Sequence, residues 1–176
     1  MYEMLFFTEE VSEAVVRLEE QLIKVNNQLS GKNKLKLVPV INMNTLKDLN
    51  FQDAQDKYQL ALDYQAMHLF GAKRAQKFLI KSQKLMLLGY KYSELNVDEL
   101  VEAAGGEWEE FLLEQTDPLI GQQVLRNQRL AGQFVRNING NWPLLIVDNE
   151  QMVELQTLLE SNDVLDLGVT LQSEII

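Results

Sequence analysis

The sequence contains no cysteine in 176 residues. Disulfides, thiolate nucleophiles and cysteine-ligated zinc are therefore excluded together, and thiol–disulfide exchange is excluded with them. The single histidine, His68, stands without a metal-ligand motif around it, so we expect no metal and no cofactor. No phosphate loop, dinucleotide fingerprint, G-x-S-x-G or H-E-x-x-H is present, which leaves no recognisable catalytic residue.

Long apolar runs are absent as well. No stretch approaches the roughly 18 apolar residues that cross a bilayer, and the first residues lack the basic start and apolar core of a signal peptide. We therefore expect a cytoplasmic protein without a membrane partner.

Basic residues are missing from the end of the chain. The net charge is −10, and no Lys or Arg follows Arg136. Such a surface repels nucleic acid, so we expect none as a partner. One basic stripe recurs at helical spacing, namely Lys73, Arg74, Lys77, Lys81 and Lys84. We predict that Lys73, Lys77, Lys81 and Lys84 contact an acidic partner, and an ordinary solvated helix face is the alternative.

The residues that are present alternate between strand and helix at the start of the chain. The apolar, aromatic run 2–7 is typical of a buried strand, and 34–43 returns to extended character. Between them Thr8 is predicted to cap a helix whose apolar residues recur at steps of four and three: Val11, Val15, Leu18, Leu22, Val25 and Leu29. A helical crossover between two strands predicts a parallel pair.

The middle of the chain is predicted to contain helices alone, separated by glycines and a proline. The five predicted helices are 52–70, 72–88, 97–104, 107–115 and 118–134. A strand follows at 143–147, with a hairpin partner at 152–155 and a short helix at 157–165.

This order of elements resembles the DsbA-like branch of the thioredoxin superfamily, in which a helical domain interrupts the fold. The predicted class is therefore α/β, a thioredoxin-like fold interrupted by an all-helical insertion. Residues 1–50 and 135–176 would form the thioredoxin-like domain, and 51–134 the helical insertion. Where that family carries Cys-x-x-Cys, this chain reads Val11, Ser12, Glu13 and Ala14. The resemblance thus implies a degenerate active site.

The sequence is more closely similar to the cytoplasmic YjbH/SpxH group. The similar residues include Phe7–Thr8, Val38–Pro39–Val40, Phe70–Gly71–Ala72–Lys73–Arg74, Glu102–Ala103–Ala104–Gly105 and Trp142–Pro143. Members of that group are adaptors that bind the thiol-stress transcription factor Spx and present it to the ClpXP protease. The resemblance implies a protein partner, a transcription regulator together with a Clp protease component. Family members often carry Cys or His near the amino terminus, and this chain has neither there.

The resemblance also implies where a polypeptide would bind. In the superfamily the proline that corresponds to Pro143 is cis, and the backbone before it pairs with an extended peptide. We predict that Thr8, Trp142 and Pro143 form the peptide-binding site. Trp142 then covers the vacated site, anchors a partner or packs in the core.

Two other functions stay open. Kappa-class glutathione transferases share this architecture and use a hydroxyl near the same helix start, so Ser12 or Thr8 could stabilise a bound thiolate. The alternative is that Thr8 is a helix cap and Ser12 a surface residue. The chain could also be a structural homodimer with the disused site packed shut.

Overall fold

The computed structural model describes residues 3–28, 33–41, 50–135, 143–147 and 151–153. Contacts along the backbone divide the chain into two compact units. The first unit comprises Met1–Val38 and Asn141–Ile176, and the second, which we call the helical unit, comprises Pro39–Gly140. The domain boundaries expected from the sequence stay predictions.

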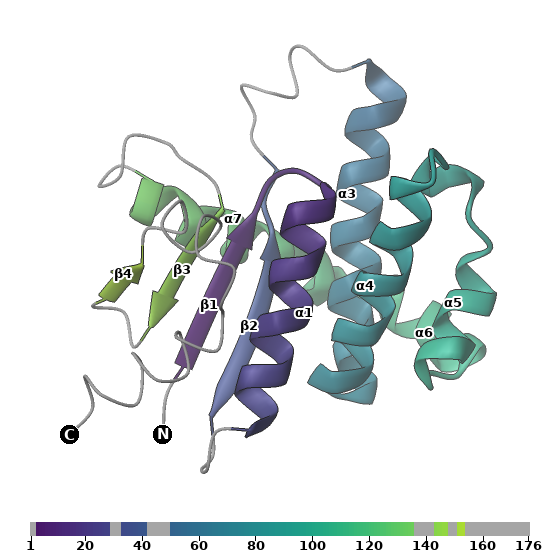
Figure 1. The fold of residues 1–176 in the computed structure, drawn as a ribbon. Helices are drawn as coiled ribbons and strands as arrows, with labels where there is room; N and C mark the ends of the chain where they lie inside the picture. The colour runs from purple at the N-terminus through teal and green to yellow at the C-terminus, as the bar shows by residue number, and fades with distance from the viewer. Residues whose placement is uncertain (1–2, 29–32, 42–49, 136–142, 148–150, 154–176) are drawn as a thin grey trace. The chain divides into compact units, whose positions relative to one another are not determined.

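The first unit is built on a sheet with the strand order β2-β1-β3-β4. Strand β1 spans Glu3–Thr8, β2 spans Lys34–Pro39, β3 spans Leu144–Val147 and β4 spans Gln151–Val153. Strand β3 pairs antiparallel with both β1 and β4, so the predicted hairpin is confirmed. Figure 1 shows β1 and β2 running in the same direction, as the predicted crossover requires.

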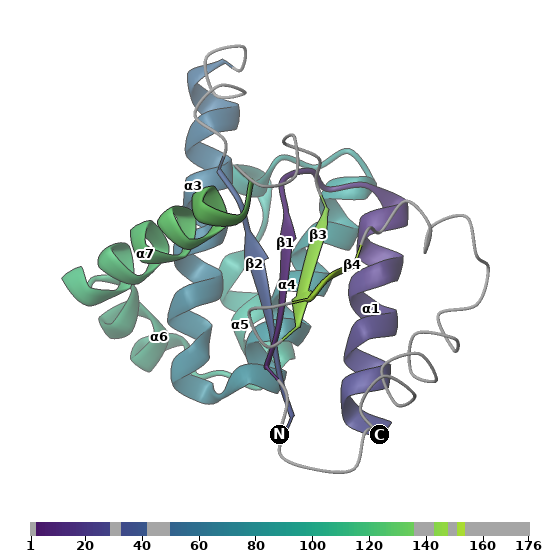
Figure 2. The same cartoon turned by 90° about the vertical axis from the view of Figure 1, so that its left-hand side faces the viewer.

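Helix α1, Glu13–Gln28, lies on one face of this sheet (Figures 1 and 2). Its buried face follows the predicted apolar spacing: Val15, Val16, Leu18, Leu22 and Val25. Residues Met4–Phe7 of β1 and all of β3 are buried beneath it or within the sheet. Burying such side chains contributes about 1.5–3 kcal/mol each, which makes this apolar layer the main source of the unit's stability.

The helical unit contains five α-helices within its described residues, as predicted. They are α3 (Phe51–Ala66), α4 (Ala72–Leu87), α5 (Val97–Ala104), α6 (Trp108–Gln115) and α7 (Pro118–Val135). Two short 3₁₀ helices are present: η1 (Met67–Phe70) follows α3 directly, and η2 (Tyr92–Glu94) lies in the connection between α4 and α5. Helix α3 contacts α4, α6 and α7, so it is the element around which the unit packs.

Glycines end helices where the sequence predicts. Gly105 has φ 94° and closes α5, while the N–H of Gly106 donates to the carbonyl of Val101. The Phe70 ring lies directly over Gly106, where an added Cβ would be 3.1 Å from Cε2 of that ring. The segments around Phe70 and Gly105 therefore pack against each other. No helix in the described ranges is long and apolar enough to cross a membrane.

Candidate functional site

The predicted degenerate site, Val11–Ala14, lies at the beginning of α1. Val11 and Ser12 precede the helix, and Glu13 and Ala14 are its first residues. The Ser12 hydroxyl oxygen accepts a hydrogen bond from the Val15 N–H at 3.3 Å, which makes Ser12 the residue that caps α1.

The predicted start of this helix is therefore wrong. Thr8 is the last residue of β1, and the helix begins at Glu13 instead of following Thr8. Ser12 is half-buried, and its hydrogen bond to the Val15 N–H gives it the capping role that the sequence assigned to Thr8. Thr and Ser are both favourable helix caps. Because β1 extends through Thr8, the helix begins later in the chain, and Ser12 is the residue that caps it.

Thr8 is buried at the end of β1, at 5% exposure, and its hydroxyl donates to Oε1 of Glu19 at 3.3 Å. Glu19 lies on α1 and is completely buried. These two residues are the buried polar side chains of the first unit, as far as its described residues go. The Thr8 side chain faces Glu19, so a bound peptide would contact the Thr8 backbone. That contact stays a prediction.

Glu19 is a residue that the sequence reading missed. It stands four residues after Val15 and three before Leu22, which places it on the buried stripe of α1. A carboxylate at such a position is rarely buried without a partner. The helical spacing therefore indicated a buried carboxylate at Glu19, but it did not identify Thr8, eleven residues away, as the partner.

Pro143 lies at the same end of the sheet as Thr8. In the β1–β3 register, Phe7 is the partner of Leu144, so one further step aligns Thr8 with Pro143. Pro143 is half-buried and directly precedes β3. The neighbouring strands thus bring Thr8 and Pro143 together, a short distance along the chain from Val11 and Ala14. Trp142 and the Trp142–Pro143 peptide bond lie outside the described residues.

Strand β3 is an interior strand, with β1 on one side and β4 on the other. Its main-chain donors and acceptors are therefore used within the sheet. A polypeptide that bound at this end by main-chain pairing would have to use the residues before Leu144.

The predicted basic stripe lies on α4, which has no acidic residue. Lys73, Arg74, Lys77 and Lys84 are exposed and Lys81 is half-buried, while the opposite side of the helix is buried through Ala75, Phe78, Leu79 and Ile80. Arg74 lies over the carboxyl end of α5, since an added Cβ on Gly105 would be 3.2 Å from its Nε. Four of the five residues of the stripe are thus exposed, and its partner stays a prediction.

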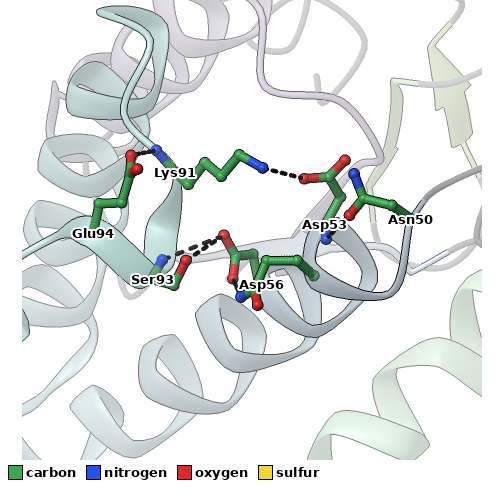
Figure 3. Close-up of polar contacts among 7 residues, drawn as sticks. Asn50, Asp53, Asp56, Lys91, Ser93 and Glu94 are labelled. Atoms are coloured by element: carbon green, nitrogen blue, oxygen red, sulfur yellow. Dashed lines mark hydrogen bonds and ion pairs between the residues drawn. The ribbon is translucent and has the colours of Figure 1, made fainter.

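Carboxylates on α3 hold the connection between α4 and α5 (Figure 3). Asp56 accepts hydrogen bonds from the N–H and the hydroxyl of Ser93, at 3.3 and 3.1 Å. The Lys91 ammonium lies 3.5 Å from Oδ1 of Asp53, and the Lys91 N–H donates to Glu94 at 2.8 Å. The view shows these groups converging on the start of α3, so their role is to fix this connection.

Asp63 is a second carboxylate of α3, and it is almost completely buried. The Tyr92 hydroxyl donates to Oδ2 at 2.6 Å, and the Gln59 and Gln115 side-chain amides donate to Oδ1. Burial raises the pKa of Asp63, against the opposing effect of these three donors. Burial, followed by the Asp63 charge, raises the pKa of the Tyr92 hydroxyl well above its usual value, so Tyr92 stays protonated as the donor. The cluster joins α3, η2 and α6.

No group of His, Asp and Glu side chains that could hold a metal occurs among the residues described. His68 lies in η1 with its ring 4.9 Å from that of Tyr64, in an edge-to-face arrangement. This surrounding is that of a packed side chain.

Comparisons with known proteins agree with this geometry. A family model described as Thioredoxin matches residues 5–167. No curated protein sequence matches the chain significantly. Among solved structures, the cytosolic disulfide reductase DsbM from Pseudomonas aeruginosa with GSH is similar with a TM-score of 0.65 and 11% identity, covering 98% of each chain.

Two further similar structures are DsbA proteins by name. The oxidoreductase DsbA from Xylella fastidiosa has a TM-score of 0.62 and 14% identity, over 98% of this chain and 87% of the other. Reduced DsbA1 from Neisseria meningitidis has a TM-score of 0.57 and 17% identity, over 98% and 85%. At such identities the likeness shows the fold alone. The predicted DsbA-like fold class is thereby confirmed.

Proposed function

Since the chain belongs to the thioredoxin family whose model it matches over residues 5–167, we propose that it is a non-catalytic member that binds a polypeptide. The observation that carries the proposal is that the β1–β3 register aligns Thr8 with the position of Pro143, a few residues before the start of α1, where Val11 and Ala14 stand in place of thiols. Thiol–disulfide exchange needs a thiolate to attack sulfur, and these 176 residues contain none.

The proposed binding mode uses the backbone just before β3. A peptide would pair with the main chain of Trp142, since Pro143 has no N–H and the strand that follows is paired on both sides. The Trp142 indole would serve as an aromatic anchor for the peptide. Recognition of this kind needs no sulfur.

The proposed biological role is that of an adaptor that delivers a stress regulator of the Spx type to the ClpXP protease in the cytoplasm. This role rests on the sequence resemblance to the YjbH/SpxH group. The basic stripe on α4, Lys73, Lys77, Lys81 and Lys84, would supply an electrostatic contact to an acidic partner. Sensing of stress through thiols of this chain is not part of the proposal.

The test is affinity purification of the tagged full chain from its host, with identification of the proteins that co-elute. We expect a Clp component and a transcription regulator with the wild type, and several-fold less regulator with Trp142→Ala. Glu10→Ala, a substitution of the exposed residue that directly precedes Val11, serves as the matched control. Recovery of neither class, or equal recovery with all three proteins, contradicts the proposal. Thermal melts establish that each variant is folded.

A second candidate function is glutathione binding, because the similar disulfide reductase DsbM is described with GSH. The Ser12 hydroxyl accepts from the Val15 N–H and keeps its own proton for donation to a thiolate. Glu9, Glu10 and Glu13 oppose an anion at this position. Glutathione at a hundred times its dissociation constant should stabilise the fold by about 2.7 kcal/mol, so an unchanged melting temperature at millimolar glutathione excludes this function.

A further inference from the structure

Helix α7 presents an exposed surface that the proposed function does not use. Leu119 is 64% exposed and Leu125 is 53% exposed, although both are large apolar residues. Arg126 and Arg129 are exposed beside them, and the helix contains no acidic residue. We call these four residues, with Gln122 and Gln123, the α7 face.

The opposite side of α7 is fully used by the helical unit. Ile120, Val124 and Ala131 are buried, and their spacing continues through Asn127. The Asn127 amide donates to Gln65 on α3 at 3.3 Å, and Gln128 binds the backbone of the segment before α3 through Pro39 and Ile41. Packing therefore holds α7 through its inner side. It does not explain why leucines and arginines occupy the outer side of the helix.

The α7 face borders an open depression along the helix, lined by Leu119, Gln122, Gln123, Leu125, Arg126 and Arg129. Its lining combines apolar side chains with amides and two guanidinium groups. This combination suits a ligand that carries both apolar and anionic groups.

The two arginines have no carboxylate partner within the described part of the chain. The ion pairs there join Arg17 with Glu13 and Lys91 with Asp53. Arg126 and Arg129 are three residues apart, so they lie on the same side of the helix. In a chain of net charge −10 the α7 face is thus a local positive surface whose charges are not neutralised by the groups described around it.

We propose that the α7 face binds an acidic segment of a partner polypeptide, one that carries leucine-sized side chains among its carboxylates. The guanidinium groups would hold carboxylates through paired hydrogen bonds, and the apolar side chains would cover Leu119 and Leu125. A nucleic acid is disfavoured because the rest of the chain is strongly acidic. A second copy docked through the same face is disfavoured because it would bring arginine against arginine.

This site shares no residue with the proposed peptide site at Trp142–Pro143 or with the basic stripe of α4. The two proposals therefore stand or fall separately.

The test measures binding of a fluorescent synthetic peptide built from leucine and glutamate in helical repeat, by fluorescence polarisation with the full chain. Arg126→Glu with Arg129→Glu should weaken binding about tenfold, and Leu119→Ala with Leu125→Ala should weaken it several-fold. The matched control is Lys24→Glu with Lys34→Glu, which changes the net charge by the same amount at two exposed residues of the first unit. The control should bind within about twofold of the wild type, and a leucine–lysine peptide should not bind.

Three results overturn the proposal. One is equal binding by the wild type and the Arg126/Arg129 variant. Another is an equal loss in the Lys24/Lys34 control, which would show a response to net charge alone. The third is tighter binding of a single-stranded oligonucleotide than of the peptide. All substituted side chains are exposed or half-exposed, and unchanged melting temperatures verify that the variants are folded.

Discussion

The two compact units use buried polar residues in different ways. In the helical unit Asp56 and Asp63 each accept hydrogen bonds from other segments, so their burial joins helices. In the first unit the described buried polar residues are Thr8 and Glu19, and they bond to each other between β1 and α1. Buried polar side chains in the helical unit thus join several elements, whereas in the described part of the first unit they form one pair that includes Thr8 of the candidate site.

The same contrast applies to residues on which the expected resemblance to the adaptor group rests. In the helical unit, Gly105 ends α5 and the Phe70 ring packs on the next residue, Gly106, so packing explains both residues. In the first unit Pro143 directly precedes β3, where the register aligns it with Thr8. The described packing therefore accounts for the residues of the helical unit, while the binding role of Pro143 stays a proposal.

The largest expected effect is on the polar joint of the helical unit. Asp63→Ala removes the acceptor for the Tyr92 hydroxyl, which is itself buried, and for two glutamine amides. We expect a loss of about 3 kcal/mol in the free energy of unfolding, measured by urea denaturation. Asp63→Asn is the matched variant, because its amide can donate to Tyr92 and its carbonyl can accept from the glutamines. A loss as large with Asn as with Ala would show that the bonds are not what Asp63 contributes.

The same residue gives a pH dependence. Burial raises the Asp63 pKa in the folded state above the 3.8 of an ordinary aspartate, so the folded state binds this proton more tightly than the unfolded state. The stability that protonation provides is therefore present below pH 3.8 and is lost as pH rises through the folded pKa. The stability of wild type minus that of Asp63→Asn should fall as pH is raised from about 4 to about 7. A difference that rises with pH contradicts the predicted direction.

The glycine joint is expected to be the next most sensitive. An added Cβ at Gly106 would lie 2.9 Å from Cγ1 of Val101 and 3.1 Å from the Phe70 ring. Gly106→Ala should cost about 2 kcal/mol through overpacking, or about 4–8 °C in melting temperature. At Gly132 on α7 an added Cβ meets nothing within 4 Å, so Gly132→Ala should instead stabilise by about 0.5–1 kcal/mol. Equal effects of the two substitutions would remove the packing explanation for the resemblance in this unit.

In the first unit, the cap of α1 is the next prediction. Ser12→Ala should cost about 1 kcal/mol in thermal or urea unfolding, because the Val15 N–H loses its acceptor. Ser12→Asp should retain most of the stability, since aspartate caps equally well. If Ser12→Ala is neutral, the helix begins elsewhere, and Val11–Ala14 does not mark the helix start.

The cap of α1 shows which structural features can be predicted from the sequence and which cannot. Apolar spacing and the glycines at 71 and 105 predict the helices because both are local signals. The choice of Ser12 over Thr8 is not local, because the Thr8 hydroxyl is bonded to Glu19 on the next element. The Asp63 cluster joins residues up to 52 positions apart, and no pattern near Asp63 announces Tyr92 or Gln115. At the candidate site, the sequence identifies Pro143 through the expected family resemblance. Its alignment with Thr8 follows only from the β1–β3 register of the structure.

The smallest effect is expected where each unit carries a surface ion pair. Arg17 lies 2.8 Å from Glu13 on α1, with side chains 68% and 80% exposed. Lys91 lies 3.5 Å from Asp53 in the helical unit, with side chains 50% and 38% exposed. Water and salt screen both pairs, so Arg17→Ala and Lys91→Ala should each change the free energy of unfolding by less than about 0.5 kcal/mol. A clearly larger loss of unfolding free energy for Lys91→Ala would show that the contacts between α3 and the α4–α5 connection in Figure 3 act as one network. The difference between the two units would then extend to their surfaces.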